Sequence, residues 1–469
     1  MKKRPEYTDL KKSLKISVSE GVSSQVFTSL GGPGSVFLTK FAVMLGATPF
    51  QFGILAAIGQ LSQLFQPLGV ALTRRSKERK PVTLKLLSVG RTIVLLFGIL
   101  PFFLPKNIAI WAFLGLFLVS SSFNAAGLNT WIAWISDLFP LRIRGRFLSR
   151  RSQFLLIAAL ITGYLFGAFV DMFDPNPGAI AIWLDNLLGI AVEGLTEFQP
   201  YAQAFVFAMA AVAGIIGVLI LRKQPERPKN VESESIAQIL IYPLKDPNFR
   251  RLLIYGLWWM LAIGIGAPFW QPFMIKKLGM SIVYIQIYGT ISVIASLASL
   301  RLWGLFIDKY GNKTAMRFAI ILGGLNPLVW LLATPDRFWI VYLEAALSGV
   351  MWSGANIVAV NLVLSIAPKE RKQAYSGVFG AFSGVAMMTT MMLSGIFLPK
   401  ALDFGGFHLE PEQVLFGITG IARWTTQIPL TWIEEPGAVP VRDTIYMLQE
   451  TAKVRIARMT EWFTGRNRR

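Results

Sequence analysis

Long apolar runs recur along the whole chain, and this feature limits the possible folds more than any other. A helix that crosses the hydrocarbon core of a bilayer needs about 20 predominantly apolar residues. Runs of that length lie near 19–45, 49–72, 86–104, 108–136, 152–172, 201–221, 252–275, 282–304, 318–333, 338–366, 373–398 and 412–433. Backbone polar groups must be satisfied internally in lipid, so each run is expected to be a helix. The sequence therefore predicts an all-α integral membrane fold with twelve transmembrane helices.

The basic residues predict which way the helices run. The chain has 46 Lys and Arg against 26 Asp and Glu, a formal net charge of +20. Thirty-eight of the 46 fall in segments 1–18, 74–85, 142–151, 222–251, 301–317, 369–372 and 434–469, which alternate with the connections on the other side. Short loops rich in Lys and Arg face the cytoplasm. We therefore expect a multi-pass inner-membrane protein with both termini cytoplasmic, and no nucleic-acid partner.

The polar segments between the runs predict the domain organisation. Residues 1–18 form a basic tail without the features of a cleaved signal peptide, and 222–250 form a polar cytoplasmic linker. These segments bound a first six-helix bundle at 19–221, with a long outer loop at 173–200, and a second bundle at 251–433. A basic tail follows at 434–469. Its apolar residues have the spacing of an amphipathic helix and are Ile445, Leu448, Ala452, Ile456 and Met459.

Residue types that carry most enzyme chemistry are scarce. The sequence has no Cys and a single His, His408, which excludes thiolate nucleophiles and His-based zinc sites. It contains no phosphate-binding glycine loop followed by Lys and Ser or Thr. We therefore expect no enzymatic activity, no metal and no cofactor.

The two halves of the chain match each other. Gly31-Gly32-Pro33 in the first run corresponds to Gly266-Ala267-Pro268 in the seventh, and Gly127 and Asn129 in the fourth correspond to Gly354 and Asn356 in the tenth. Such matches in order predict two parallel six-helix repeats about an axis along the membrane normal.

A charged loop between the eighth and ninth runs carries a family resemblance. The segment Gly304-Leu-Phe-Ile-Asp308-Lys309-Tyr-Gly311-Asn-Lys313 resembles the signature loop of the major facilitator superfamily. In that family the loop's charge cluster holds the cytoplasmic side closed, so the resemblance implies gating roles for Gly304, Asp308, Lys309, Gly311 and Lys313. The first-half copy is degraded, because Thr73 stands where the acidic residue is expected.

A second family pattern lies between the fourth and fifth runs. Asp137-Leu-Phe-Pro140-Leu-Arg-Ile-Arg144-Gly145-Arg146 resembles the family's acidic-x-x-Pro-x3-Arg-Gly motif. We hypothesise that Asp137, with Arg144, Gly145 and Arg146, takes over part of the gating role that Thr73 cannot fill. Simple pairing of charges at a helix end is the alternative interpretation. The family's proline-bearing antiporter motif is missing from the fifth run, which disfavours multidrug/proton antiport.

The resemblance implies a central cavity lined by helices 1, 4, 7 and 10. Matching helix interruptions in two halves point to a transport site, although the glycines there could also serve packing and bending alone. Glu344 is the clearest intramembrane acid. Helix 1 is expected to bury no carboxylate, so proton coupling rests on Glu344. The predicted cavity residues are Gln25, Gly31, Pro33, Asn124, Asn129, Gly266, Pro268, Trp270, Glu344 and Asn356.

Three intramembrane bases remain. Lys40 is a candidate gate partner of Glu344, or it snorkels to the interface. Arg91 is expected to anchor a helix end, and Arg423 to be structural and peripheral.

These observations predict a secondary active or facilitative transporter that moves a small solute by alternating access. The sequence leaves open whether a proton or another cation is transported together with the solute. Membrane lipids are expected to surround the chain, which is expected to be a monomer. The alternative is a protein that handles lipids or pigments, or assembles membrane complexes, on the same fold.

Overall fold

The computed structural model describes residues 7–66, 69, 72–73, 78–138, 141–175, 177–178, 182–183, 186–187, 189, 195–226, 241–368, 371–404 and 407–435. Almost all of these residues are helical. The predicted amphipathic helix in the tail, and residues 227–240 of the linker, lie outside the described residues.

The first bundle contains six membrane segments, several of them made of consecutive helical pieces. Its elements are α1 (Tyr7–Gly31), α2 (Val36–Met44), α3 (Pro49–Gln63), α5 (Lys80–Ile93), η1 (Val94–Ile99), α6 (Leu100–Phe103), α7 (Lys106–Leu138), α8 (Leu141–Asp171), η3 (Thr196–Phe198) and α10 (Gln199–Leu221).

The second bundle repeats this order and adds a small β-hairpin. Its elements are η4 (Pro243–Lys245), α12 (Pro247–Gly266), α13 (Trp270–Lys276), α14 (Ile282–Tyr310), α15 (Asn312–Val329), η5 (Trp330–Leu332), η6 (Pro335–Arg337), α16 (Ile340–Ile366), α17 (Lys372–Ile396), β1 (Leu402–Phe404), β2 (Phe407–Leu409), α18 (Pro411–Thr425) and α19 (Gln427–Thr431). The hairpin pairs antiparallel, with Asp403 opposite His408.

The predicted fold class is confirmed. Within the described residues, nine helical segments are long and apolar enough to cross a membrane, and they include every predicted run except the first, second and twelfth. The first run is interrupted after α1, and α2 has only 9 residues. In the twelfth run α18 has 15 residues, and the second run contains residues outside the described part. Several helices extend beyond their apolar runs: α1 begins at Tyr7 and α8 at Leu141. Hydropathy detects only the part of a helix that is apolar, so it underestimates helix length.

Helix breaks occur at the matching positions that the repeat predicts. The first membrane segment is interrupted between Gly31 and Val36, and the seventh between Gly266 and Trp270. Gly34 has a φ of +83°, a backbone conformation that glycine adopts without a steric penalty. Ser35 then caps α2, because its side chain accepts the backbone N–H of Phe37.

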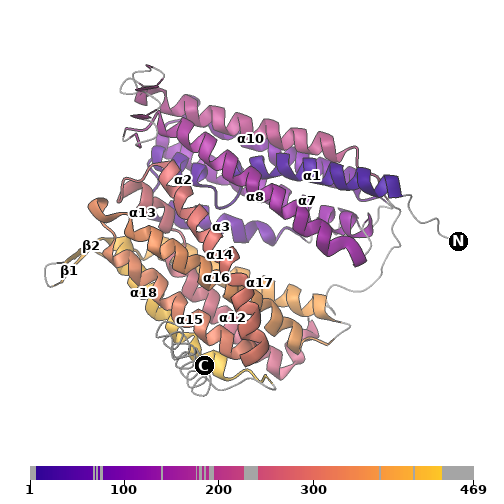
Figure 1. Ribbon diagram of the computed structural model, residues 1–469. Helices are drawn as coiled ribbons and strands as arrows, with labels where there is room; N and C mark the ends of the chain where they lie inside the picture. The colour runs from indigo at the N-terminus through magenta and orange to yellow at the C-terminus, as the bar shows by residue number, and fades with distance from the viewer. Residues whose placement is uncertain are drawn as a thin grey trace, which may run out of the picture.

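The apolar packing shared by the two bundles lies toward one end of the molecule. We call the end with the β-hairpin the hairpin end, and the opposite end, where α10 finishes and α12 begins, the linker end (Figure 1). One apolar cluster, which includes Phe41, Phe113, Phe273 and Phe416, contains residues of both bundles. The other two clusters each belong to one bundle: one lies around Trp134 of α7, and the other around Trp259 of α12. The shared packing therefore lies toward the hairpin end.

The two bundles approach most closely where small residues face each other. A Cβ atom added to Gly53 of α3 would lie 2.6 Å from the carbonyl oxygen of Met391 in α17, and one added to Gly395 would lie 2.8 Å from that of Pro49. On the other side of the molecule, the Tyr164 hydroxyl of α8 lies 2.8 Å from Thr290 Oγ1 of α14. Small residues allow such close backbone packing between membrane helices.

Candidate functional site

A central cavity of about 720 Å³ lies between the two bundles. Helices of both bundles form its walls, including α1, α3 and α8 from the first and α12, α14 and α16 from the second. Its polar lining residues include Gln25, Thr28, Ser29, Thr39, Gln271, Gln286, Thr290, Asn326, Glu344, Ser348 and Arg423. Among these, the charged groups come from the second bundle only.

The charged wall is built by three consecutive contacts. Glu344 of α16 is 2% exposed, and its Oε1 accepts a hydrogen bond from the Asn326 side-chain amide of α15. Asn326 Oδ1 lies 3.5 Å from Nη1 of Arg423 in α18, which also donates to the carbonyl of Gly323 at 3.0 Å. Asn326 thus connects a buried carboxylate to a buried guanidinium. Arg423 Nε has no hydrogen-bond partner among the described residues, whereas the side chains of Tyr288 and Trp330 also interact with the Glu344 carboxylate.

Aromatic side chains form another part of the wall. The ring of Trp270 in α13 stacks on Phe416 of α18 with centroids 3.8 Å apart and tilts against Trp330 at 5.0 Å. The Arg423 guanidinium lies 6.0 Å from the centroid of the Trp352 ring. These contacts fix the rings and the cation relative to one another.

The hairpin end of the cavity is closed by polar contacts between the bundles. Thr39 of α2 donates to Gln271 Oε1 at 2.6 Å, and the Gln271 amide donates to the Gly34 carbonyl at 3.0 Å. The carboxylate of Asp171, at the end of α8, accepts the backbone N–H groups of Ile282 and Val283 at 2.7 and 2.9 Å. Asp171 therefore caps the first turn of α14 from the other bundle.

The structure distributes the predicted cavity residues over three environments. Gln25, Pro33, Pro268, Trp270 and Glu344 line the central cavity. Gly31 and Asn124 instead line a smaller cavity of about 200 Å³ inside the first bundle. The remaining three line neither cavity: Asn129 donates to Gln66 at 3.4 Å, Gly266 packs close to Thr419, and Asn356 is exposed.

The expectations for Lys40 were both wrong. Lys40 is 7% exposed and forms an ion pair with Asp174, which follows α8 in the outer-loop segment. It therefore neither snorkels to an interface nor pairs with Glu344. The sequence does not indicate this pair, because Asp174 follows α8 while Lys40 lies in α2, 134 residues earlier in the chain.

The signature loop forms the turn from α14 to α15 at the linker end. Gly311 makes the turn with a φ of +87°, while Asp308 and Lys309 are exposed and Gly304 has open space beside it. Lys313 donates to the carbonyls of Thr431 and Ile433 at 2.8 and 2.7 Å. Asp308 has no ion pair within the part of the chain that the structure describes.

The second gating motif is described by its backbone alone. Asp137 lies in the last turn of α7, and Arg144, Gly145 and Arg146 lie at the start of α8. The side chains of Asp137, Arg144 and Arg146 are outside the described part, so their gating role stays a prediction.

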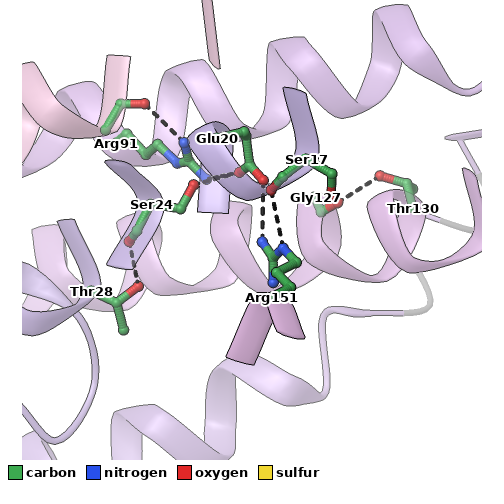
Figure 2. A network of polar contacts seen from close by, with 9 residues as sticks. Ser17, Glu20, Ser24, Thr28, Arg91, Gly127, Thr130 and Arg151 are labelled. Carbon is green, nitrogen blue, oxygen red and sulfur yellow. Dashed lines mark hydrogen bonds and ion pairs between the residues drawn. The ribbon is translucent and has the colours of Figure 1, made fainter. Parts of the chain in front are cut away.

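Helix 1 does bury a carboxylate, contrary to expectation. Glu20 of α1 is 3% exposed and lies between two arginines (Figure 2). Its Oε1 is 3.6 Å from Arg91 Nη2 of α5, and its Oε2 is 3.2 Å from Arg151 Nη2 of α8. Sequence reasoning missed this because α1 begins well before the apolar run, which placed Glu20 at the membrane edge.

Arg423 also differs from expectation, because it lines the central cavity instead of lying at the periphery. Asn326 is a cavity residue that sequence reasoning missed. Its position directly before Pro327, within an apolar run, was the available signal: proline removes a helix hydrogen bond there, and a polar side chain in lipid needs a partner.

The fold and the cavity define a class: multi-pass membrane proteins with two six-helix repeats around a central site. The profile of the Major Facilitator Superfamily matches residues 24–389. The chain therefore belongs to that superfamily.

Two solved structures share the fold over nearly the whole chain. The nucleoside transporter NupG has a TM-score of 0.63 and 15% identity, and the alignment covers 91% of this chain and 98% of NupG. The inward-open xylose transporter XylE from E. coli has a TM-score of 0.59 and 13% identity, covering 92% and 96%. At such identities these likenesses show the fold alone.

A curated relative is more similar in sequence but over a shorter stretch. The multi-drug resistance efflux pump PmrA of Streptococcus pneumoniae is 30% identical over 166 residues, which is 34% of this chain. The match spans 36% of the length of PmrA.

Proposed function

We propose that this protein is a secondary active or facilitative transporter that moves a small polar solute by alternating access. The observation that carries the proposal is the central cavity, which both bundles line and which, within the described residues, is sealed by polar contacts between the bundles at the hairpin end. The charge distribution supports a cytoplasmic linker end with both termini on that side. With this orientation, the central cavity opens toward the cytoplasm in this conformation. Because one chain supplies both halves of the cavity, a monomer is sufficient.

The solute is proposed to carry both hydrogen-bond donors and acceptors. The Glu344 carboxylate is a buried acceptor in the cavity wall, and Arg423 Nε is a buried donor without a partner among the described residues. Unpaired buried polar atoms are unfavourable, so a ligand that satisfies both gains free energy. The buried charges of Glu344 and Arg423 in this wall disfavour the alternative of a lipid- or pigment-handling protein, whose cargo is uncharged and apolar.

A thermal-shift screen of polar metabolites on the purified protein tests the proposal, followed by uptake of any hit into proteoliposomes. Glu344→Gln should lower the affinity for the hit about tenfold, as expected for loss of one charge-assisted hydrogen bond. If Glu344 also carries a proton, this variant loses uptake driven by a pH gradient and retains exchange. Glu197→Gln, an exposed site at the hairpin end, is the matched control. Equal affinity in the wild type and Glu344→Gln contradicts this role of Glu344.

Export of apolar cations is a second candidate, favoured by the likeness to PmrA and by the walls of Trp270, Trp352, Met387 and Met391. Methionine and aromatic side chains adapt to varied apolar ligands. Ethidium efflux from proteoliposomes that is stimulated by a pH gradient would favour this candidate over transport of a polar solute.

A further inference from the structure

The smaller cavity inside the first bundle has its own charged cluster, separate from the central cavity. It has a volume of about 200 Å³ and is lined by residues of α1, α3, α5, α7 and α8. Thr28 of α1 and Pro33 of the following break line both cavities. The first membrane segment therefore forms the wall between the two cavities.

The charges that line this cavity do not cancel. Glu20 faces both Arg91 and Arg151, so the cluster of described residues carries one excess positive charge (Figure 2). Arg91 is 5% exposed, and its Nη1 donates to the Gly214 carbonyl of α10 at 2.8 Å. Arg151 lies with its guanidinium 4.6 Å from the Trp131 ring centroid. An uncompensated charge in a water-poor environment is unfavourable.

The helices are shaped to hold these guanidinium groups. A Cβ atom added to Gly217 would lie 2.8 Å from Arg91 Nη1, and one added to Gly21 would lie 2.8 Å from Arg151 Nε. Glycine at these positions therefore leaves space that any other residue would fill.

The unsatisfied atoms of the cavity are all able to donate. Three buried atoms on its lining residues lack a hydrogen-bond partner among the described residues: Arg91 Nε, Ser121 Oγ and Trp131 Nε1. Arg91 and Trp131 have only donors to offer, and the Ser121 hydroxyl can rotate to donate. Trp131 lies ten residues beyond Ser121 in α7, about 15 Å along the helix axis, so one small group cannot reach both. A negatively charged acceptor beside Arg91 and Ser121 would satisfy those two donors. A single water occupies about 30 Å³, so the cavity has room for a larger group.

We propose that this cavity binds a small monovalent anion, either an inorganic ion or a simple carboxylate. Its negative charge balances the excess positive charge, and its oxygen or halide accepts from Arg91 and Ser121. The assignment of this anion site does not depend on which solute the central cavity binds.

The test uses the full-length protein, purified and dialysed into potassium gluconate, which is bulkier than the proposed ligands. Chloride and formate are titrated at constant ionic strength while Tm is measured. A ligand that binds only the folded state raises Tm in a saturable way. Saturation by chloride identifies an inorganic source, and saturation by formate alone identifies a carboxylate. A linear change, or none, for both anions indicates general salt effects or water in the cavity and overturns the proposal.

Matched variants locate the site. Ser121→Ala removes one unpaired donor and should raise the apparent Kd for the anion about tenfold, whereas Trp131→Phe, ten residues further along α7, should leave it nearly unchanged. Ser122→Ala is the control, because Ser122 Oγ is equally buried and unpaired but does not line this cavity. Equilibrium dialysis with radiolabelled chloride or formate, on variants that elute as monodisperse protein, measures the Kd directly. An unchanged Kd in Ser121→Ala places the anion elsewhere and overturns the assignment.

Discussion

The carboxylate of Asp171 accepts the backbone N–H of Ile282 at 2.7 Å, so the last residue of α8 in one bundle caps the first residue of α14 in the other. Asp171 is 1% exposed. The contact holds the bundles together where the cavity is closed, and it must break if the hairpin end opens.

Asp171→Asn should therefore favour opening of the hairpin end. Asparagine lacks the negative charge and one acceptor, and loss of a charge-assisted hydrogen bond of about 1.5–3 kcal/mol shifts the equilibrium tenfold or more. The chain has no native Cys, so spin labels can be attached to Lys106→Cys and Lys400→Cys, which are exposed residues of different bundles. Pulsed electron paramagnetic resonance should show a larger long-distance population. Asp403→Asn, in the exposed hairpin, is the control, and an unchanged distance distribution in Asp171→Asn would contradict a gating role.

Gly53→Ala should disturb the packing of α3 on α17. The added methyl group would lie 2.6 Å from the Met391 carbonyl oxygen, so the helices must separate. Such overpacking costs about 1–3 kcal/mol. The expected result is a lower Tm in detergent. Gly115→Ala in α7 is the matched control, because nothing lies within 4 Å of its added Cβ atom, and an equal Tm for the two variants would disprove the close approach.

Glu20→Gln should destabilise the first bundle. Breaking a buried charge pair by removing one partner costs about 3–5 kcal/mol, since Arg91 and Arg151 then lose their counter-charge. A decrease in Tm of roughly 5 °C or more is expected. Glu434→Gln removes an exposed pair with Arg251 and should leave Tm nearly unchanged. Equal Tm changes in the two variants would argue against the Glu20 network as a stabilising element.

Lys277 offers a pH-dependent test at the hairpin end. Its ammonium donates to Glu410 Oε2 at 2.6 Å, and this hydrogen bond, together with the negative charges of Glu410 and Glu412, raises the pKa of Lys277 above 10.5. The stabilisation is therefore fully present below pH 10.5 and is lost as the pH rises through the raised pKa. Because the pair is partly exposed, its contribution stays below about 1 kcal/mol.

Lys277→Met should accordingly lower Tm slightly at pH 8, and its difference from the wild type should shrink at strongly alkaline pH. Lys276→Met, at the neighbouring exposed position, should show no such pH dependence. A constant difference between Lys277→Met and the wild type from pH 8 to pH 11 would show that the ion pair is not its source.

The buried arginines show why part of the site was unpredictable. Arg91 of α5 donates to the Gly214 carbonyl of α10, and Arg423 of α18 donates to the Gly323 carbonyl of α15. Arg91 also lies near the buried carboxylate of Glu20, and Arg423 lies near that of Glu344. Neither partner lies at a helical spacing from its arginine in the sequence, so only the packing of distant helices reveals the pairs.

The sequence by itself determined the membrane fold, its repeat and the positions of the two helix breaks. The bilayer requires long apolar helices, and proline beside glycine interrupts them at positions that can be read locally. The tertiary structure decided the partners of Glu20, Lys40, Asp171, Asn326 and Arg423, and with them which end is closed. A buried charge needs a counter-charge or a hydrogen bond, and its chemistry fixes the kind of partner it needs. Which residue supplies that partner depends on how the helices rotate and pack.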